Sequence, residues 1–307
     1  MSTEQKQESP AVQRWYATRT PRAGGVANQV RTGTGTRVAI QGEPGSFSHE
    51  AALKLVPEAE IAPCSLSAEV FEALSSGAVD AAVIPIENSL AGSVLEHFDL
   101  LLQHDVTVQG EALLRIRHNL IALPGRKIED IRRVFSHPVA LAQCRRFLAE
   151  HARMESFAFY DTAGSVKQLV ELKDAEAAAI ASKSAAAFYG AEILRENIED
   201  NPENYTRFFL VRRAQDAVSD ADANKMTLAF SLENRPGSLV SALLELSRLG
   251  TNLTKIESRP VHGKPWEYIF YVDCQIDGLA QRDQAIAALQ PHCAMLKSLG
   301  SYRGSRE

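Results

Sequence analysis

A threonine and an arginine stand side by side in a segment that otherwise has the composition of a β-strand, Asn204-Tyr205-Thr206-Arg207-Phe208-Phe209-Leu210-Val211. Aromatic and β-branched residues favour strands. An arginine among apolar neighbours needs an anion, because an unpaired buried charge is costly. Its planar guanidinium can bind a carboxylate or phosphate through two hydrogen bonds. The segment therefore indicates a catalytic site, unless Thr206 lies on an exposed strand face and Arg207 in a surface ion pair.

Further polar residues follow several predicted strands, at the positions where open α/β sheets bind ligands. Helices that begin there offer free N–H groups and the positive end of the helix dipole to an anion. Together with Arg207, these positions would form a site suited to a small dicarboxylate. Each of them can also be an ordinary turn or helix cap. The segments are Gln41 to Ser48, Pro85 to Ser89, Ser136-His137-Pro138 and Tyr160-Asp161-Thr162.

Strands and helices are predicted to alternate through residues 38–212, which indicates α/β layers with mainly parallel strands. The first half contains strands at 38–40, 60–63 and 81–86 and helices at 46–55, 67–75 and 92–103. Extended segments at 106–108 and 113–123 lead to a second half, with strands at 133–135, 156–160 and 177–181 and helices at 138–150, 164–172 and 183–189. The strand at 205–212 closes the region. This pattern predicts two lobes with a cleft between them.

A different pattern follows a polar linker. Strands at 226–232, 252–258, 268–275 and 293–299 and helices at 237–249 and 281–289 give the order βαββαβ, which is the ferredoxin-like arrangement. We therefore expect a disordered tail at 1–35, a two-lobed domain at 36–213, a linker at 214–224 and a small domain at 225–302. Within the tail, Trp15 and Tyr16 are the residues that would dock on the body or on a partner.

Composition excludes several classes of protein. The 307 residues are 45% hydrophobic and 23% charged, with a net charge of −5, which argues against a nucleic-acid-binding protein. Four widely spaced cysteines favour reduced thiols in the cytoplasm. No apolar run approaches membrane-spanning length, so no membrane association is expected. Glu4 and Glu8 weigh against a transit peptide.

The order of the motifs resembles the prephenate dehydratase family. The matching segments are Gly42 to Ser48, Pro85 to Ser89, Ser136-His137-Pro138 with Gln143-Cys144, Tyr160 to Ala163 and Tyr205 to Phe208. Asn234 to Leu239 and Glu257 to Pro260 resemble the regulatory ACT domain of that family. The resemblance covers residues 37–300 or so and implies a two-lobed, periplasmic-binding-protein-like catalytic domain followed by an ACT domain.

The resemblance implies a carbon–oxygen lyase that removes water and carbon dioxide from prephenate to give phenylpyruvate, on the route to phenylalanine. Because aromatisation drives this reaction, we expect no cofactor and no metal. The protein must supply position and a proton for the departing hydroxyl. Thr206 would donate that proton or orient the hydroxyl. Arg207 would be a carboxylate anchor or a structural brace, and the sequence does not separate the two.

The remaining site residues are also assigned by resemblance. The catalytic set is Thr206, Asn88, Ser136, Gln143, Glu87 and Asp161, and the substrate-binding set is Arg207, Ser89, Ser46, Ser48 and Phe208. The neutral residues would bind the carboxylates and the side-chain carbonyl without adding charge. Glu87 and Asp161, beside an anionic substrate, would orient Arg207 or other donors, or tune proton transfer.

Phenylalanine is the expected allosteric ligand of the ACT domain. It would bind where two such domains pair, at Asn234, Pro236, Gly237, Ser238, Leu239, Glu257, Ser258 and Arg259. The pairing implies a homodimer or homotetramer. Two alternatives to the main hypothesis stay open. The enzyme would act on arogenate instead, or the chain would be a two-lobed amino-acid sensor without catalysis.

Overall fold

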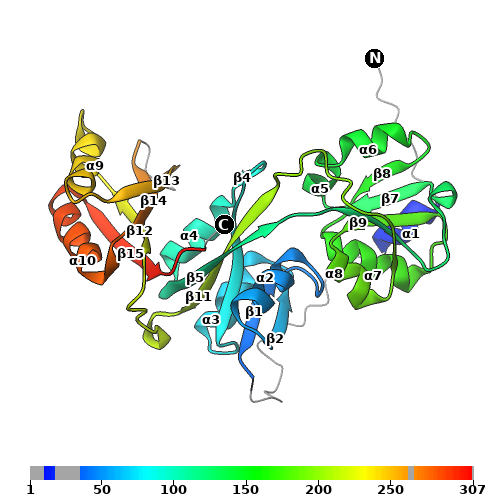
Figure 1. Cartoon of the computed structure of the whole chain (residues 1–307), viewed down its shortest axis with the longest axis horizontal. Coiled ribbons are helices and arrows are strands. Elements are labelled where there is room, and N and C mark those ends of the chain that lie inside the picture. The colour runs from blue at the N-terminus through cyan, green and yellow to red at the C-terminus, as the bar shows by residue number, and fades with distance from the viewer. Residues whose placement is uncertain (1–9, 18–34, 262–265, 306–307) are drawn as a thin grey trace. The chain divides into compact units, whose positions relative to one another are not determined.

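The computed structural model describes residues 10–17, 35–261 and 266–305 (Figure 1). Its contacts divide the chain into two compact units. One unit holds a lobe formed by Arg117–Pro202 together with Gly42–Ser46 and the N-terminal helix, which we call the second lobe. The other holds the first lobe, with residues 35–41 and Phe47–Ile116, together with the C-terminal domain. Among the described helices, none is long and apolar enough to cross a membrane.

The first lobe is built on one mixed sheet in the order β2-β1-β3-β11-β5, with β4 paired to β3. Its strands are β1 (Arg37–Gln41), β2 (Glu60–Cys64), β3 (Ala81–Asn88), β4 (Gly92–Ser93), β5 (Val106–Arg115) and β11 (Tyr205–Arg213). Its helices are α2 (Phe47–Leu55), α3 (Ser67–Ser75) and α4 (Leu95–Gln103). Strand β1 runs parallel to β2 and β3, whereas β11 is antiparallel to both β3 and β5. The sheet is therefore mixed, rather than mainly parallel as predicted.

The two faces of β11 carry different residues because side chains alternate along a strand. Phe208 and Leu210 pack with Val83 in the core that α2 covers. Arg207 and Phe209 point the other way, and the guanidinium lies over the Phe209 ring at 5.0 Å from its centroid. Thr206 has the same parity as Phe208, so it lies on the α2 face of the sheet.

The second lobe has a five-stranded sheet in the order β10-β6-β9-β7-β8. Its strands are β6 (Asn119–Ala122), β7 (Arg133–Ser136), β8 (Glu155–Ala158), β9 (Ala177–Ala181) and β10 (Glu192–Arg195). Its helices are α5 (Pro138–Ala142), α6 (Arg145–Glu150), α7 (Thr162–Leu172) and α8 (Lys183–Tyr189). Ala177, Ala179 and Ala181 of β9 pack with α7 and α8, and Ala178 and Ile180 pack with α5 and α6 (Figure 1). Both faces are thus covered by helices, as an α/β architecture requires.

One helix predicted at 138–150 is instead two. The carboxylate of Asp200 accepts hydrogen bonds from the backbone N–H groups of Arg145 and Arg146, both at 3.0 Å. These bonds satisfy the free donors at the start of a new helix. The break falls at Gln143 and Cys144, where no local sequence signal marks a helix end, because the capping residue comes from a distant part of the chain.

The N-terminal segment contains a helix, α1 (Pro10–Ala17), that packs into the second lobe. Trp15 is 1% exposed and stacks on Phe135, with ring centroids 3.7 Å apart, and it meets Phe159 edge-on. Its indole N–H donates to Asp174 at 3.1 Å. The expectation of a disordered tail is therefore wrong for residues 10–17. Residues 1–9 and 18–34 lie outside the described part of the chain.

The C-terminal domain has the predicted βαββαβ order, with all strands antiparallel in the order β13-β14-β12-β15. Its elements are β12 (Lys225–Ser231), α9 (Ser238–Arg248), β13 (Asn252–Pro260), β14 (Tyr268–Gln275), α10 (Gly278–Leu289) and β15 (Met295–Tyr302). The two helices cover one face of the sheet around Leu228, Phe230 and Val272. Short 3-10 helices at Ile128–Asp130, Ala214–Asp216 and Gln290–His292 complete the described elements.

The C-terminal domain packs closely against the first lobe. A Cβ atom at Gly300 would lie 2.3 Å from the backbone oxygen of Val108, so only glycine allows β15 to approach β5 this closely. The Lys297 ammonium donates to the backbone oxygens of Leu101, Leu102 and His104. Lys297 belongs to β15, and its ammonium satisfies carbonyl groups that the C-terminal end of α4 leaves without helical partners.

Asp161 is the N-cap of α7. Its carboxylate accepts a hydrogen bond of 2.6 Å from the backbone N–H of Gly164, which confirms the alternative interpretation of this residue as a cap. Burial raises the pKa of the Asp161 carboxyl to about 6, the Gly164 N–H opposes that rise, and the nearby Glu43 carboxylate adds to it. The charged form of Asp161 is therefore disfavoured in the folded state relative to the unfolded state.

We predict that the free energy of unfolding of Asp161→Asn increases relative to that of the wild type as the pH rises from about 4 to about 7. The carboxyl ionises near 3.8 when unfolded and near 6 when folded, so wild-type stability from this group falls as the pH increases through that window. The amide keeps the cap without a charge. The free energy of unfolding of the variant relative to wild type should rise by up to ~3 kcal/mol across the window.

Thermal unfolding at several pH values measures this difference. Glu171→Gln, on an exposed position of the same helix, is the control. A relative stability of Asp161→Asn that stays flat or falls with increasing pH would contradict the assignment.

Candidate active site

Thr206 and Asn88 form the centre of the site predicted in the first lobe. They lie directly opposite each other on β11 and β3. The Asn88 amide nitrogen donates to the Thr206 hydroxyl oxygen at 2.8 Å, and it also lies near Asn204 Oδ1 at 2.7 Å and the Tyr205 oxygen at 3.1 Å. The Asn88 amide oxygen accepts from the N–H groups of Leu90 and Ala91. Because backbone groups have fixed roles, these partners settle the orientation of the amide.

This arrangement leaves the Thr206 proton available. A hydroxyl oxygen that accepts from Asn88 can donate its own hydrogen in another direction. Within the described part of the chain, no acceptor for that hydrogen lies in hydrogen-bonding range of Thr206. The geometry thus leaves the Thr206 hydroxyl able to donate a hydrogen bond near the start of β11.

A β-bulge in β3 creates the pairing. Phe208 pairs with Pro85, but Arg207 pairs with Glu87, so Ile86 is an extra residue without a partner on β11. In regular pairing Thr206 would face Glu87, and the extra residue inverts the alternation of side chains beyond it. Asn88 therefore joins Thr206 on one face of the sheet, and Glu87 joins Arg207 on the other.

Neighbouring groups hold the bulge in place. The Ile86 backbone oxygen accepts from the Val94 N–H at 2.9 Å, and the Pro85 oxygen lies 2.5 Å from His97 Nδ1. Since a carbonyl only accepts, Nδ1 must carry the proton. Burial lowers the pKa of His97, against the opposing effect of the Pro85 hydrogen bond. His97 is thus a buried neutral residue that supports β3, and proline fits the bulge because it has no N–H to lose from the sheet.

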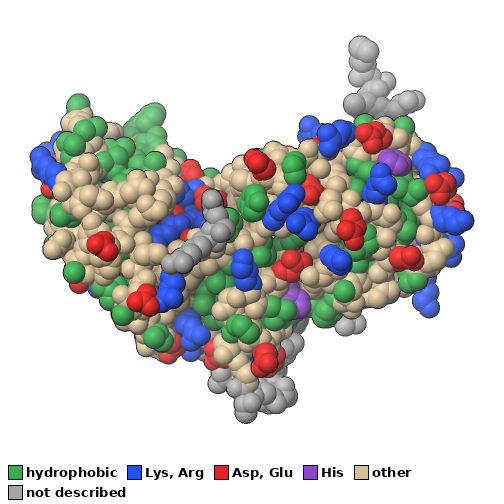
Figure 2. Space-filling model, in the orientation of Figure 1, with side chains coloured by type: hydrophobic (Ala, Val, Ile, Leu, Met, Phe, Trp, Pro, Cys, Tyr) green, Lys and Arg blue, Asp and Glu red, His purple; other side chains and the backbone are tan. Residues whose placement is uncertain are grey.

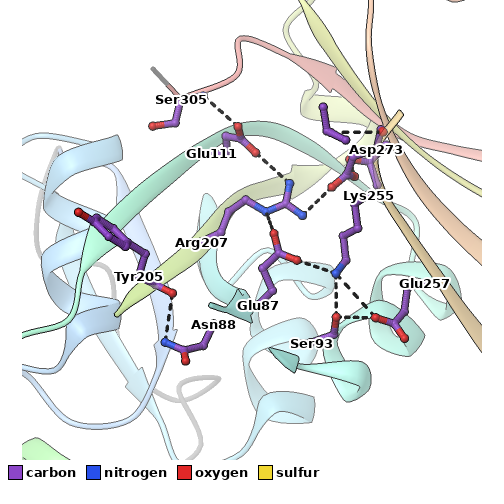
Figure 3. Close-up of polar contacts among 12 residues, drawn as sticks. Glu87, Asn88, Ser93, Glu111, Tyr205, Arg207, Lys255, Glu257, Asp273 and Ser305 are labelled. Carbon is purple, nitrogen blue, oxygen red and sulfur yellow. Dashed lines mark hydrogen bonds and ion pairs between the residues drawn. The ribbon is translucent and has the colours of Figure 1, made fainter. Parts of the chain in front are cut away.

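Arg207 is surrounded by carboxylates of its own chain (Figure 3). Its side chain is 7% exposed. Its Nε atom forms an ion pair with Glu87 at 2.7 Å, one terminal nitrogen donates to Glu111 at 3.1 Å, and the other donates to Asp273 at 2.5 Å. All three guanidinium nitrogens therefore have an anionic partner. This arrangement favours the role of a brace over that of a carboxylate anchor.

The charges in this cluster stabilise each other. Burial alone would lower the pKa of Arg207, but Asp273 and the other acidic groups around it raise that pKa above its ordinary value. Burial alone would raise the pKa of Glu87, but Arg207 and Lys255 hold it below its ordinary value. Glu87 is therefore a carboxylate near neutral pH, which suits an orienting group rather than a proton donor.

Lys255 of β13 extends the network into the C-terminal domain. Its ammonium donates to Glu87 at 2.6 Å and to the Ser93 hydroxyl at 2.8 Å. Ser93 in turn donates to Glu257 at 2.6 Å. Arg259, two residues further along β13, pairs with Asp99 of α4. One side of β13 therefore presents three charged residues to the first lobe. Figure 3 shows two of them, Lys255 and Glu257.

A pocket of about 300 Å³ lies beside this network. Ser89 contributes to its wall, and its hydroxyl donates to the Glu203 oxygen and accepts from the Tyr205 N–H, which ties the end of β3 to the start of β11. The wall is formed by Glu87, Asn88, Ser89, Gly92, Ser93, Leu113, Tyr205, Arg207 and Lys255.

The structure places four predicted site residues in the second lobe. Ser136 is fully buried, and its hydroxyl donates to the Ile180 oxygen of the neighbouring strand β9 at 2.6 Å. Gln143 ends α5, and its amide oxygen lies 2.9 Å from His118 Nε2. Ser46 and Asp161 both lie near Gly42, where an added Cβ would be 3.8 Å from Ser46 Oγ and 2.8 Å from Asp161 Oδ2. The geometry of Ser136 favours a structural role, and the catalytic roles of the other three stay predictions.

The remaining predicted residues lie in different settings. Phe208 belongs to the core of the first lobe, and Ser48 is buried in α2, so packing accounts for Phe208. In the C-terminal domain, Gly237 adopts φ +85° just before α9, and the Ser238 hydroxyl is a buried atom without a hydrogen-bond partner among the described residues. Ser258 is exposed, whereas Glu257 and Arg259 contact the first lobe.

Sequence reasoning missed three members of the cluster around Arg207. These are Glu111, Lys255 and Asp273. A signal for Asp273 was present, because a carboxylate within the apolar strand Tyr268–Gln275 needs a cationic partner as much as Arg207 needs an anionic one.

Comparison with known proteins places the chain in one family. The sequence model of the prephenate dehydratase family matches residues 38–216. The chain is 41% identical over 289 residues to arogenate dehydratase/prephenate dehydratase 2, chloroplastic, of Arabidopsis thaliana, covering 90% of this chain and 75% of that protein.

Two solved structures are similar in fold and sequence. The prephenate dehydratase of Arthrobacter aurescens in complex with L-Phe has a TM-score of 0.79 and 34% identity, covering 87% of this chain and 90% of that one. GqqA, described as a novel type of quorum-quenching acylase, has a TM-score of 0.80 and 33% identity, covering 88% and 98%. The extent of the family match and the identity to the Arabidopsis protein give one conclusion: this chain belongs to the prephenate dehydratase family.

Proposed function

We propose that the protein is a prephenate dehydratase, which converts prephenate to phenylpyruvate by loss of water and carbon dioxide. The observation that supports this most is the contact between Asn88 and Thr206. It fixes the threonine hydroxyl as an acceptor from one side and leaves its proton free to reach a departing hydroxyl. Membership of the family gives the reaction class, a dehydration with decarboxylation.

The chemistry requires little beyond position and a proton. As the carboxylate leaves as carbon dioxide, its electrons form the aromatic ring and expel the ring hydroxyl, which departs as water once it gains a proton. A threonine hydroxyl is a weak acid, so its hydrogen bond to the leaving oxygen contributes most as negative charge develops there. Arg207 and Glu87 act from the opposite face of the sheet by holding the two strands.

We predict that Thr206→Ala lowers kcat for prephenate by about 100-fold or more, because general acid assistance commonly supplies a factor of that order. Thr206→Ser keeps the hydroxyl and should retain a much larger share of the rate. Phenylpyruvate formation by purified protein measures both variants, and circular dichroism checks that each folds. Equal rates for wild type and Thr206→Ala would contradict the role of this hydroxyl.

Arogenate is the alternative substrate, because the name of the Arabidopsis relative includes both activities. Arogenate differs from prephenate in carrying an amino group where prephenate has a keto oxygen. Parallel assays with each substrate distinguish the two, since prephenate gives phenylpyruvate and arogenate gives phenylalanine. Turnover of neither substrate by the wild type would favour the non-catalytic sensor instead.

Feedback control by phenylalanine is the second part of the proposal. The Arthrobacter relative was solved with L-Phe. In this chain, Gly237 and the unpartnered Ser238 hydroxyl lie at the start of α9, where backbone N–H groups suit a carboxylate. Val240 and Leu244 of α9 and Ile256 of β13 are exposed, and Figure 2 shows hydrophobic side chains at that end of the C-terminal domain. Such exposed apolar residues fit the pairing of two C-terminal domains in a homodimer or homotetramer.

We predict that saturating L-phenylalanine lowers dehydratase activity and raises the thermal unfolding midpoint by roughly 4–6 °C, because a ligand at about 100 times its Kd adds about 2.7 kcal/mol of stability. D-phenylalanine is the control, because a site that reads both the carboxylate and the amino group distinguishes the enantiomers. Light scattering in the same samples measures the oligomer. Activity and midpoint that both stay unchanged with L-phenylalanine would contradict this regulation.

The location of the protein stays a prediction. The Arabidopsis relative is named chloroplastic, whereas the composition of this chain favours the cytoplasm. Fractionation of cells that express the full chain decides between the two.

A further inference from the structure

We propose that Asp273 and Lys255 of the C-terminal domain are positioning residues for the dehydratase reaction. They hold Arg207 and Glu87, and through them the two strands that carry Thr206 and Asn88. The kinetic part of this inference rests on the proposed function. It makes the C-terminal domain a structural part of the catalytic site as well as the place where an effector binds.

The four first-lobe residues occupy adjacent positions on two neighbouring strands, β11 and β3. Arg207 follows Thr206 on β11, and Glu87 precedes Asn88 on β3, with each pair directly opposed across the two strands. Side chains of consecutive strand residues point to opposite faces. Whatever fixes Arg207 and Glu87 on one face therefore fixes the backbone from which Thr206 and Asn88 project on the other.

Hydrogen bonds within the C-terminal domain hold the Asp273 carboxylate in place. This residue is 1% exposed and lies in β14. One of its carboxylate oxygens accepts from Arg207 at 2.5 Å, and the other accepts from the Thr227 hydroxyl at 2.7 Å. Thr227 is also hydrogen-bonded to the Tyr302 hydroxyl at 2.8 Å. Three strands of the C-terminal sheet thus fix the carboxylate that binds Arg207.

Lys255 contacts β3, the second of the two strands. Its ammonium bonds Glu87 and Ser93, so it bridges β3 and the short strand β4 that pairs with it. The bulge at Ile86 lies within this segment, and a bulged strand lacks the regular pairing that would otherwise fix its register. Lys255 therefore supplies a contact from the C-terminal domain to the residue that directly follows the bulge in β3.

A regulatory consequence follows from the place of Lys255 on β13. The same strand side carries Glu257 and Arg259, which contact Ser93 and Asp99. A change in the position of β13 on effector binding would reach Glu87 through Lys255 and so alter the geometry of Asn88 and Thr206. Coupling of this kind requires only that the effector favours one of two positions of the strand.

The test is a double-mutant cycle on the full chain. We expect Lys255→Met to lower kcat about tenfold with KM within about twofold of wild type, because small displacements of a catalytic group reduce the rate of the chemical step. In an Asn88→Ala background, the same substitution should change kcat by about twofold or less, because its effect passes through a contact that is already lost. Lys255→Arg, which keeps a cationic donor, should recover most of the wild-type rate.

Lys297→Met is the matched control. Lys297 also joins the C-terminal domain to the first lobe, but it contacts the end of α4 rather than β3 or β11. We expect it to leave kcat within about twofold of wild type. Equal effects of Lys255→Met in both backgrounds, or equal effects of Lys255→Met and Lys297→Met, would overturn the inference.

Hydrogen–deuterium exchange separates this inference from the proposed function. In Lys255→Met, we expect faster exchange in peptides that cover residues 82–93 and 203–212, and unchanged exchange there in Lys297→Met. This measurement needs no substrate. Wild-type protein that turns over neither prephenate nor arogenate would refute the proposed function alone, whereas unchanged exchange in Lys255→Met would refute the positioning role.

Discussion

The Arg207 guanidinium is almost completely buried and keeps its positive charge, so the protein must surround it with anions. Glu87 comes from the neighbouring strand, Glu111 from the strand on the other side, and Asp273 from the C-terminal domain. Removing one partner of a buried ion pair typically costs about 3–5 kcal/mol, because the other charge is left uncompensated. The cluster therefore joins β11 to the strands on both sides of it and joins the first lobe to the C-terminal domain.

The bulge at Ile86 determines which residues of β3 face Arg207 and which face Thr206. Without the extra residue, Glu87 would lie beside Thr206, and the Asn88 amide would lie on the opposite face. With it, the neutral amide meets the hydroxyl, and the carboxylate meets the guanidinium. In the proposed reaction an anionic substrate would meet neutral hydrogen-bonding groups, because the acidic residues lie on the other face of the sheet, where they pair with Arg207 and Lys255.

Much of the fold could be predicted from the sequence. Strands such as 81–86 and helices such as 67–75 have clear hydrophobic patterns and are bounded by residues that favour the start or end of such elements. The alternation in 226–299 also predicted the βαββαβ domain. Residue type marks Thr206 and Arg207 in their strand, and the apolar neighbours of Arg207 indicate its need for an anion. The position of Asn88 after a predicted strand and the family resemblance mark Asn88. Glu87 was among the residues expected to orient Arg207, and it does pair with it. Glu111 and Asp273 were not predicted, since they are 96 and 66 residues away from Arg207 in sequence. The bulge and the antiparallel strand β11 depend on tertiary contacts such as the Val94 bond to Ile86, which no local pattern indicates.

The role of Arg207 as a brace is the central claim, and steady-state kinetics of Asp273→Asn test it most directly. This substitution keeps an acceptor for the Thr227 hydroxyl but removes the carboxylate charge that binds Arg207. A brace predicts that kcat falls about tenfold while KM for prephenate stays within about twofold. If Arg207 instead binds a substrate carboxylate, loss of a competing anion would lower KM and leave kcat near its wild-type value, and that result would contradict the account.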